Sequence, residues 1–176
     1  MEEIQIKEPY KYERGYIYLP VSFYFSSFPD TINFSGNVFS KKDSFHVSLL
    51  YTPNIFSLVA SDRPVDDKML EQEILSAFNE YNKNSPIVFD GVRKEFRKAT
   101  KGENQSIVIC CEVKNLRGLF DVYKKIFAVD VPYQPAHVTL YTLIPNVGIG
   151  INSEKAMEKC PQINPPELDE AIGNLK

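Results

Sequence analysis

The two histidines of the sequence stand in matching surroundings. Residues 45–49 (FHVSL) and 136–140 (AHVTL) each follow a histidine with valine, a hydroxyl residue and leucine. An imidazole titrates near neutral pH, so one histidine can accept a proton while the other donates one. A hydroxyl can donate a hydrogen bond to the charge that develops on a phosphate oxygen. The pattern therefore predicts phosphodiester chemistry that needs no metal or other cofactor. The candidate catalytic residues are His46 and His137, and the candidate substrate-binding hydroxyls are Ser48 and Thr139.

Both stretches have the composition of β-strands, because valine, leucine, threonine and tyrosine dominate them. Side chains alternate between the two faces of a strand. His46 and Ser48 therefore share one face, as do His137 and Thr139. Two such strands side by side would direct both imidazoles and both hydroxyls into one cleft.

The same alternation separates two tyrosines that follow the motifs. Counting from His137, Tyr141 falls on the cleft face, whereas Tyr51 falls on the face opposite His46. We expect Tyr141 either to stack on a nucleobase as a further substrate-binding residue or to fill space beside the cleft. A bulge in the strand would reverse this orientation.

Other interpretations of the histidines are weaker. Chance alone would give two histidines in this pattern on the order of once in several hundred chains. A structural zinc site is not favoured, because the chain has only two histidines and its three cysteines lack ligand spacing. Histidines buried in the core for packing alone would predict loss of folding, not of activity, when His46 is replaced.

Length and composition restrict the class of protein. The 176 residues suit a single domain (1–176), and 43% hydrophobic residues are typical of a globular chain with a full core. The net charge of −3 does not favour binding of long nucleic acid. We expect a nucleotide, cyclic nucleotide or oligonucleotide end as the partner, and no membrane. The cysteine usage and an N-terminus that does not resemble a signal peptide indicate a cytoplasmic protein.

The remaining pattern predicts alternating strands and helices. We expect strands at residues 16–21, 45–49, 87–89, 92–96, 107–113 and 136–140, and helices at 64–81, 116–127 and 153–160. We expect connections without regular structure at residues 26–44 and 53–63, a turn or bulge at 90–91, and a loop or bulged strand at 145–150. Residues 1–13 form a loose leader or an edge segment, and residues 162–176 are either a docked helix or flexible. Lys41 and Lys42 stand at the end of the first connection. We favour solvated side chains for both lysines over the alternative, a cation beside the phosphate.

This arrangement resembles the two-histidine phosphoesterase superfamily, which includes 2′-5′ RNA ligase-like proteins and cyclic nucleotide phosphodiesterases. The resemblance rests on the paired H-x-[S/T] motifs and on the order of elements between residues 15 and 151, including Pro135 just before the second motif. It implies an α+β fold with two pseudo-symmetric lobes, each an antiparallel sheet with helices outside, facing a central cleft.

The resemblance also implies an activity. It makes His46 and His137 the acid–base pair of a metal-independent phosphodiesterase that hydrolyses a 2′,3′-cyclic phosphate, a 2′-5′ linkage or a cyclic (oligo)nucleotide, as in RNA-end processing. The alternative is a catalytically silent module that binds nucleotides or RNA ends on the same fold. The sequence departs from the family at residues 26–44, where members have a helix, so no subfamily's substrate can be carried over.

Overall fold

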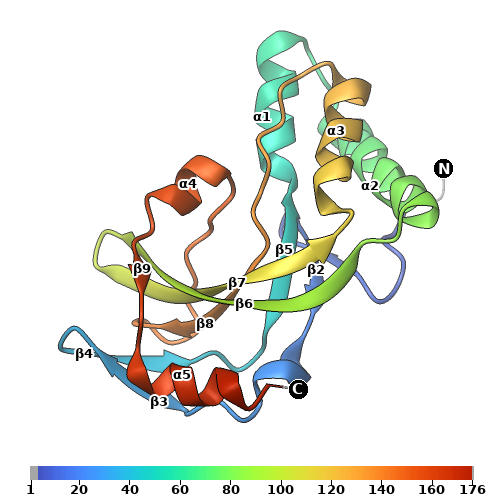
Figure 1. Ribbon diagram of the computed structural model, residues 1–176. Coiled ribbons are helices and arrows are strands. Elements are labelled where there is room, and N and C mark those ends of the chain that lie inside the picture. Colours follow the sequence, from blue (N-terminus) through green and yellow to red (C-terminus); the bar gives the residue numbers. More distant parts are fainter. Residues whose placement is uncertain (1–3, 176) are drawn as a thin grey trace.

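One open antiparallel sheet with helices packed beside it gives the protein an α+β fold (Figure 1). The structure is a computed structural model and describes residues 4–175. Its strands are β1 (Lys11–Glu13), β2 (Tyr16–Pro20), β3 (Thr31–Phe34), β4 (Asn37–Lys41), β5 (His46–Tyr51), β6 (Val88–Lys101), β7 (Asn104–Lys114), β8 (His137–Thr142) and β9 (Gln162–Ile163). Its helices are η1 (Ser22–Phe25, a 3₁₀ helix), α1 (Thr52–Asp62), α2 (Asp67–Asn84), α3 (Leu116–Phe127), α4 (Glu154–Glu158) and α5 (Pro166–Gly173).

Strands β5 and β8, which carry the two histidine motifs, are neighbours in the middle of the sheet. The strand order is β1-β2-β5-β8-β7-β6-β9, and β4 pairs with the far part of β8 and carries β3 at its other edge. Strand β7 is buried along most of its length, as the apolar run at residues 107–113 predicts. The fold therefore brings two motifs that are far apart in the sequence into direct contact.

Helices α1, α2 and α3 pack in one large core with one face of the sheet (Figure 1). The predictions for α2 and α3 are confirmed, since both helices bury apolar residues at helical spacing. Asp66 caps α2 by accepting a hydrogen bond from the backbone N–H of Met69. Asn115 takes the left-handed conformation before α3, and its side chain donates to the carbonyl of Pro86 instead of capping the helix.

A smaller core covers part of the opposite face. Ile109 faces the large core, and its neighbours Val108 and Cys110 turn to the other side, where Ile151 and Met157 pack against them. Burial raises the pKa of the Cys110 thiol to about 11, which keeps it protonated and agrees with a packing role. Helix α4 holds Met157 in place, and Ser153 caps it by accepting from the N–H of Ala156. The segment from 148 to 157 therefore lies on the same side of the sheet as the histidines.

Residues 26–44 are not the unstructured connection that their serine, asparagine and glycine content predicts. Strands β3 and β4 form a hairpin there, and both turn residues, Ser35 and Gly36, have positive φ. That geometry belongs to the two-residue turns that match the twist of paired strands. The hairpin is held in place because Ile32 and Phe39 are buried in the large core.

One further expectation for regular structure is wrong, because residues 53–62 lie in helix α1. Pro53 stands in the first turn of this helix, where proline needs no N–H partner. Ile55 and Val59 are buried at helical spacing, but this short pattern follows directly on the motif strand. The strands expected at 87–89 and 92–96 are joined in the single strand β6, whose register shifts between Phe89 and Val92, so the bulge at residues 90–91 is the correct alternative.

Both ends of the described chain are ordered against the core. Residues 4–13 contribute the edge strand β1 and the buried Tyr10, so the edge segment is the correct alternative there, while residues 1–3 lie outside the described residues. In the tail, β9 pairs with β6, and α5 docks through the buried Leu168 and Ile172, so the docked helix is the correct alternative. Lys176 lies outside the described residues. None of the helices formed by residues 4–175 combines the length and apolarity needed to cross a membrane.

Candidate active site

The two motifs meet where β5 and β8 pair. Val47 and Val138 are cross-strand partners, and both side chains are fully buried on the large-core face. Extending this antiparallel register by one residue in each direction places Ser48 across from His137, and His46 across from Thr139. Because strand neighbours alternate, all four of these side chains point away from the core.

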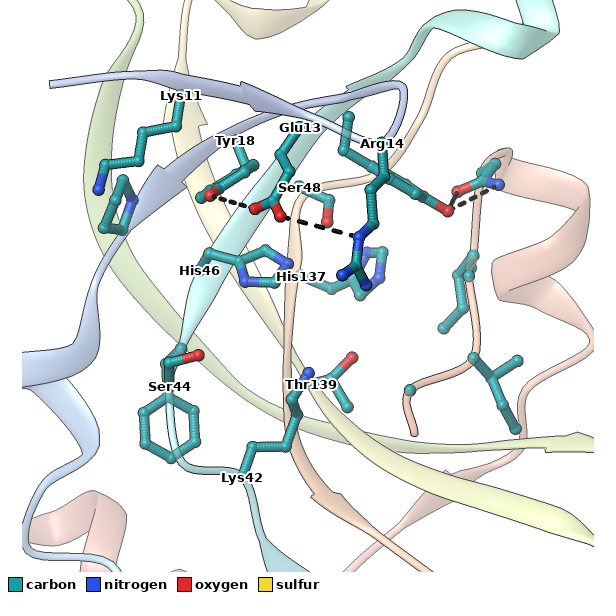
Figure 2. A pocket seen from close by; sticks show the side chains of 18 of the residues that line it. Lys11, Glu13, Arg14, Tyr18, Lys42, Ser44, His46, Ser48, His137 and Thr139 are labelled. Atoms are coloured by element: carbon teal, nitrogen blue, oxygen red, sulfur yellow. Dashed lines mark hydrogen bonds and ion pairs between the residues drawn. The ribbon is translucent and has the colours of Figure 1, made fainter. Parts of the chain in front are cut away.

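These four side chains line one cavity of about 580 Å³, the central cavity (Figure 2). Figure 2 shows the two imidazoles side by side, with Ser48 and Thr139 on opposite sides of the pair. Other walls of the cavity come from the hairpin of β1 and β2, from Lys42 and from residues 148–152. The predicted catalytic pair and both predicted hydroxyls are therefore brought together.

The imidazole of His137 is held in one tautomer by the backbone. The residue is 4% exposed, and Nδ1 lies 2.8 Å from the carbonyl oxygen of Pro135. A carbonyl can only accept, so Nδ1 donates its proton and Nε2 of the neutral ring has a free lone pair. Burial lowers the pKa of His137, and the bond to Pro135 opposes this shift. These surroundings therefore favour a neutral His137 whose Nε2 can accept a proton.

His46 is also neutral at neutral pH, for different reasons. Burial lowers its pKa to about 4, the charge of Lys42 adds to that shift, and so does the charge that His137 would carry when protonated, while Glu13 opposes it. The ring centroids of His46 and Tyr18 are 4.7 Å apart, so the tyrosine packs against the imidazole. A bound phosphate would bring negative charge beside both histidines and raise both pKa values.

Lys42 supplies a cation inside the cavity, contrary to the expectation of two solvated lysines. Its backbone N–H donates to the carbonyl of Leu140, which ties the β4 end to β8. A Cβ placed on Gly148 would lie 3.8 Å from Thr139 Oγ1 and 4.0 Å from Lys42 Nζ, so the hydroxyl and the ammonium border the same space. Burial lowers the pKa of Lys42.

The side chain of the neighbouring Lys41 is directed away from the central cavity. Its Nζ donates to the carbonyl of Phe28 and pairs with Asp30, at 2.7 and 2.8 Å. Lys41 lies outside the central cavity. Adjacent side chains of an extended segment point to opposite sides, and this separates the two lysines. Because the sequence did not predict the hairpin of β3 and β4, it could not distinguish Lys41 from Lys42.

The hairpin of β1 and β2 contributes cavity residues that the sequence did not single out, at the end of the predicted leader or edge segment (1–13) and just after it. Lys11, Glu13 and Arg14 all line the cavity, and Figure 2 shows Glu13 between Tyr18 and Arg14. Tyr18 donates to Glu13 over 3.3 Å, and Arg14 Nε lies 3.7 Å from the same carboxylate. The site therefore holds three cations besides the histidines, with one carboxylate among them.

The expected position of Tyr141 is wrong, because β8 contains a bulge. Val108 pairs with Thr139 and Ile107 pairs with Tyr141, which leaves Leu140 as an extra residue. At Leu140 the alternation of side chains between the two faces of the sheet therefore reverses. Tyr141 is fully buried in the large core, where its hydroxyl donates to the carbonyl of Pro29 over 2.7 Å. It does not line the cavity.

The same irregularity occurs after the first motif. Tyr18 pairs with Ser48 and Ile17 pairs with Leu50, so Leu49 is the extra residue in β5. Tyr51 is turned toward Tyr16, which lines the cavity, and the two ring centroids are 4.5 Å apart. It is therefore Tyr51, through Tyr16, that contacts the site.

Comparisons of the chain with protein-family models, curated proteins and solved structures found no match. Within residues 4–175, no group of three or more His, Cys, Asp or Glu side chains is placed to hold a metal ion. The chemistry of the site is therefore inferred from its own residues.

Proposed function

We propose that the protein is a phosphodiesterase that hydrolyses a 2′,3′-cyclic phosphate, a 2′-5′ linkage or a cyclic (oligo)nucleotide by two-histidine acid–base catalysis. The observation that supports this proposal most is the central cavity, where each imidazole lies across the strand pair from a hydroxyl. Acid–base pairs of this kind can cleave a phosphodiester without a metal ion. The surrounding lysines and arginine match the charge of a phosphate.

The proposed reaction uses each group at a stated atom. One histidine removes a proton from water or a ribose hydroxyl as its oxygen attacks phosphorus, and the other protonates the leaving oxygen as its bond to phosphorus breaks. His137 reacts through Nε2, since Nδ1 is engaged with Pro135. Ser48, Thr139 and Lys42 stabilise the negative charge on the non-bridging oxygens.

The proposal extends to the arrangement of the chain. Each motif consists of a strand with a histidine, a hydroxyl residue and then a bulged leucine, at Leu49 and at Leu140. This repetition supports two pseudo-symmetric lobes that meet at the central cavity. Each lobe would contribute one imidazole and one hydroxyl to a shared phosphate.

A substrate panel tests the proposal. We would incubate the protein, in the presence of a chelator, with 2′,3′-cyclic AMP, a 2′-5′-linked diadenylate and a cyclic dinucleotide, and separate the products by chromatography. We expect hydrolysis of at least one of them, and its loss in His46→Ala and His137→Ala proteins that retain the wild-type melting temperature. Tight binding without turnover would instead identify the silent nucleotide-binding module.

A further inference from the structure

A second cavity, which contains none of the four motif residues, adjoins the central cavity. This side cavity, of about 490 Å³, lies between the start of α1 and the segment 150–156. Gly150 and Asn152 line both cavities, so the two share a wall. A ligand bound at the histidines can therefore extend toward α1.

Residue 150, in the shared wall, is a glycine that lies close to Tyr16. A Cβ at this position would lie 2.8 Å from the hydroxyl oxygen of Tyr16, closer than side chains tolerate. The Tyr16 hydroxyl is also 3.4–3.5 Å from the side-chain amide of Asn152. Any larger residue at 150 would force Tyr16 to move, so the shape of the wall between the two cavities depends on this glycine.

The side cavity differs from the central one in its chemistry. Among residues 4–175, no charged side chain lines it, whereas Lys11, Arg14 and Lys42 line the central cavity. Its polar groups are amides and hydroxyls, and its apolar contacts come from Leu58, Pro132 and Ala156. This combination suits a neutral ligand with flat apolar faces and hydrogen-bonding edges.

The polar groups of the side cavity are placed to form hydrogen bonds with the edges of such a ligand. Asn54 Nδ2 donates to the backbone carbonyl of Asn152 over 3.0 Å, which fixes the orientation of the amide and makes its Oδ1 an acceptor. Ser57, one turn into α1, is exposed and can both donate and accept. Ser153 already accepts from the N–H of Ala156 and still has a hydroxyl proton to donate.

We propose that the side cavity is a nucleobase subsite, and that the substrate is consequently a dinucleotide or longer molecule, linear or cyclic. The base of the nucleotide next to the scissile phosphate occupies the side cavity, while the phosphate lies at the cationic centre. A base has the required neutral faces and polar edges, and a phosphate does not. This inference rests on the proposed function, and it excludes a mononucleoside cyclic phosphate as the preferred substrate.

Substitutions of Ser57 test the subsite. Ser57→Leu places apolar volume inside the side cavity, and Ser57→Ala removes only the hydroxyl. Ala60→Leu is the matched control, because Ala60 is exposed on the same helix and lines neither cavity. We would measure kcat/KM for a 2′-5′-linked diadenylate, a cyclic dinucleotide and 2′,3′-cyclic AMP, and check folding by thermal melting.

The readout is the ratio of dinucleotide to mononucleotide kcat/KM. We expect the wild type to prefer a dinucleotide, and Ser57→Leu to lower that ratio by roughly ten- to a hundredfold, the range for losing a base contact. Ser57→Ala should lower it less, and Ala60→Leu should not change it. A wild type that prefers 2′,3′-cyclic AMP, or a ratio that Ser57→Leu does not change, would overturn the subsite and leave the proposed phosphodiesterase intact.

If the wild type hydrolyses none of the three compounds, the proposed function fails, and binding of the diadenylate decides the subsite by itself. Calorimetry should then show weaker binding to Ser57→Leu than to Ala60→Leu. Equal binding to these two variants would overturn the subsite as well.

Discussion

His137 Nδ1 and the carbonyl oxygen of Pro135 lie 2.8 Å apart, so the backbone two residues before the histidine fixes its tautomer. His46 has no comparable backbone bond within residues 4–175, and its ring is positioned by the ring of Tyr18. The two imidazoles of the proposed catalytic pair are therefore oriented by different means, a hydrogen bond in β8 and an aromatic contact in β5. This difference matters for the pH behaviour of the pair.

The pH profile of kcat/KM for a nucleotide phosphodiester should be bell-shaped, with its maximum on the acid side of the ordinary histidine pKa. The reaction needs one neutral and one protonated imidazole, and burial lowers the pKa of both, that of His46 to about 4. The two limbs belong to the coupled pair in the free enzyme. Steady-state kinetics from about pH 4 to about pH 9 would measure them. A rate that rises steadily with pH and is abolished by a chelator would indicate metal-bound hydroxide instead.

The same shifts predict that the protein loses stability in mild acid. A histidine whose pKa is lowered by folding binds a proton in the unfolded chain before it does so in the native state, so the loss occurs as pH falls from about 6.5 toward the folded pKa. We expect the free energy of unfolding to decrease by about 1–3 kcal/mol over this range. Urea denaturation at several pH values would show it. In a His46→Gln, His137→Gln double variant the decrease should be smaller, and an unchanged decrease would assign it to other groups.

Removing either motif hydroxyl should slow hydrolysis without unfolding the protein. Ser48→Ala and Thr139→Val each delete one donor to the developing phosphate charge, and losses of this kind amount to roughly ten- to a thousandfold in kcat. Neither hydroxyl has a hydrogen-bond partner within residues 4–175, so the melting temperature should stay close to that of the wild type. Wild-type kcat in both variants would exclude the hydroxyls from the reaction.

Lys42 and Lys41 offer a matched pair of substitutions. Lys42→Met should reduce kcat/KM by roughly ten- to a hundredfold, because it removes a cation that borders the same space as Thr139. Lys41→Met should leave kcat/KM unchanged, since Lys41 pairs with Asp30 and Phe28 outside the cavity. Steady-state kinetics at two salt concentrations would measure both variants, with a weaker effect of salt on Lys42→Met than on the wild type. Equal losses in the two variants would point to general surface charge rather than to a phosphate contact.

The sequence predicted what depends on local pattern. Two motifs with strand composition predicted that His46 and His137 would each share a face with a hydroxyl, and helical spacing predicted α2 and α3. The pairing of β5 with β8 depends on non-local contacts, and neither the sequence nor the family resemblance, which implied two lobes facing a cleft, predicted it.

What the sequence did not predict depends on non-local structure. The hairpin of β3 and β4 is rich in turn-forming residues and is held by burial of Ile32 and Phe39, which propensity alone does not reveal. The sequence does not predict the bulges at Leu49 and Leu140 either, because leucine is compatible with regular and bulged strands. One extra residue in each strand was enough to exchange the expected positions of two tyrosines.

That exchange leads to the last prediction, which compares Tyr141 with Tyr51. Tyr141→Phe removes a buried hydroxyl and leaves the carbonyl of Pro29 without its donor, so we expect a loss of about 1–3 kcal/mol in the free energy of unfolding. Nucleotide affinity should not change, because Tyr141 does not line the cavity. Tyr51→Leu should do the reverse: it removes the ring that packs against Tyr16 and should weaken nucleotide binding, with a smaller effect on stability. Urea denaturation and calorimetric titration of both variants would separate the two effects. If Tyr141→Phe weakened nucleotide binding and Tyr51→Leu did not, the regular alternation from His137 would be correct and the bulge at Leu140 would be wrong.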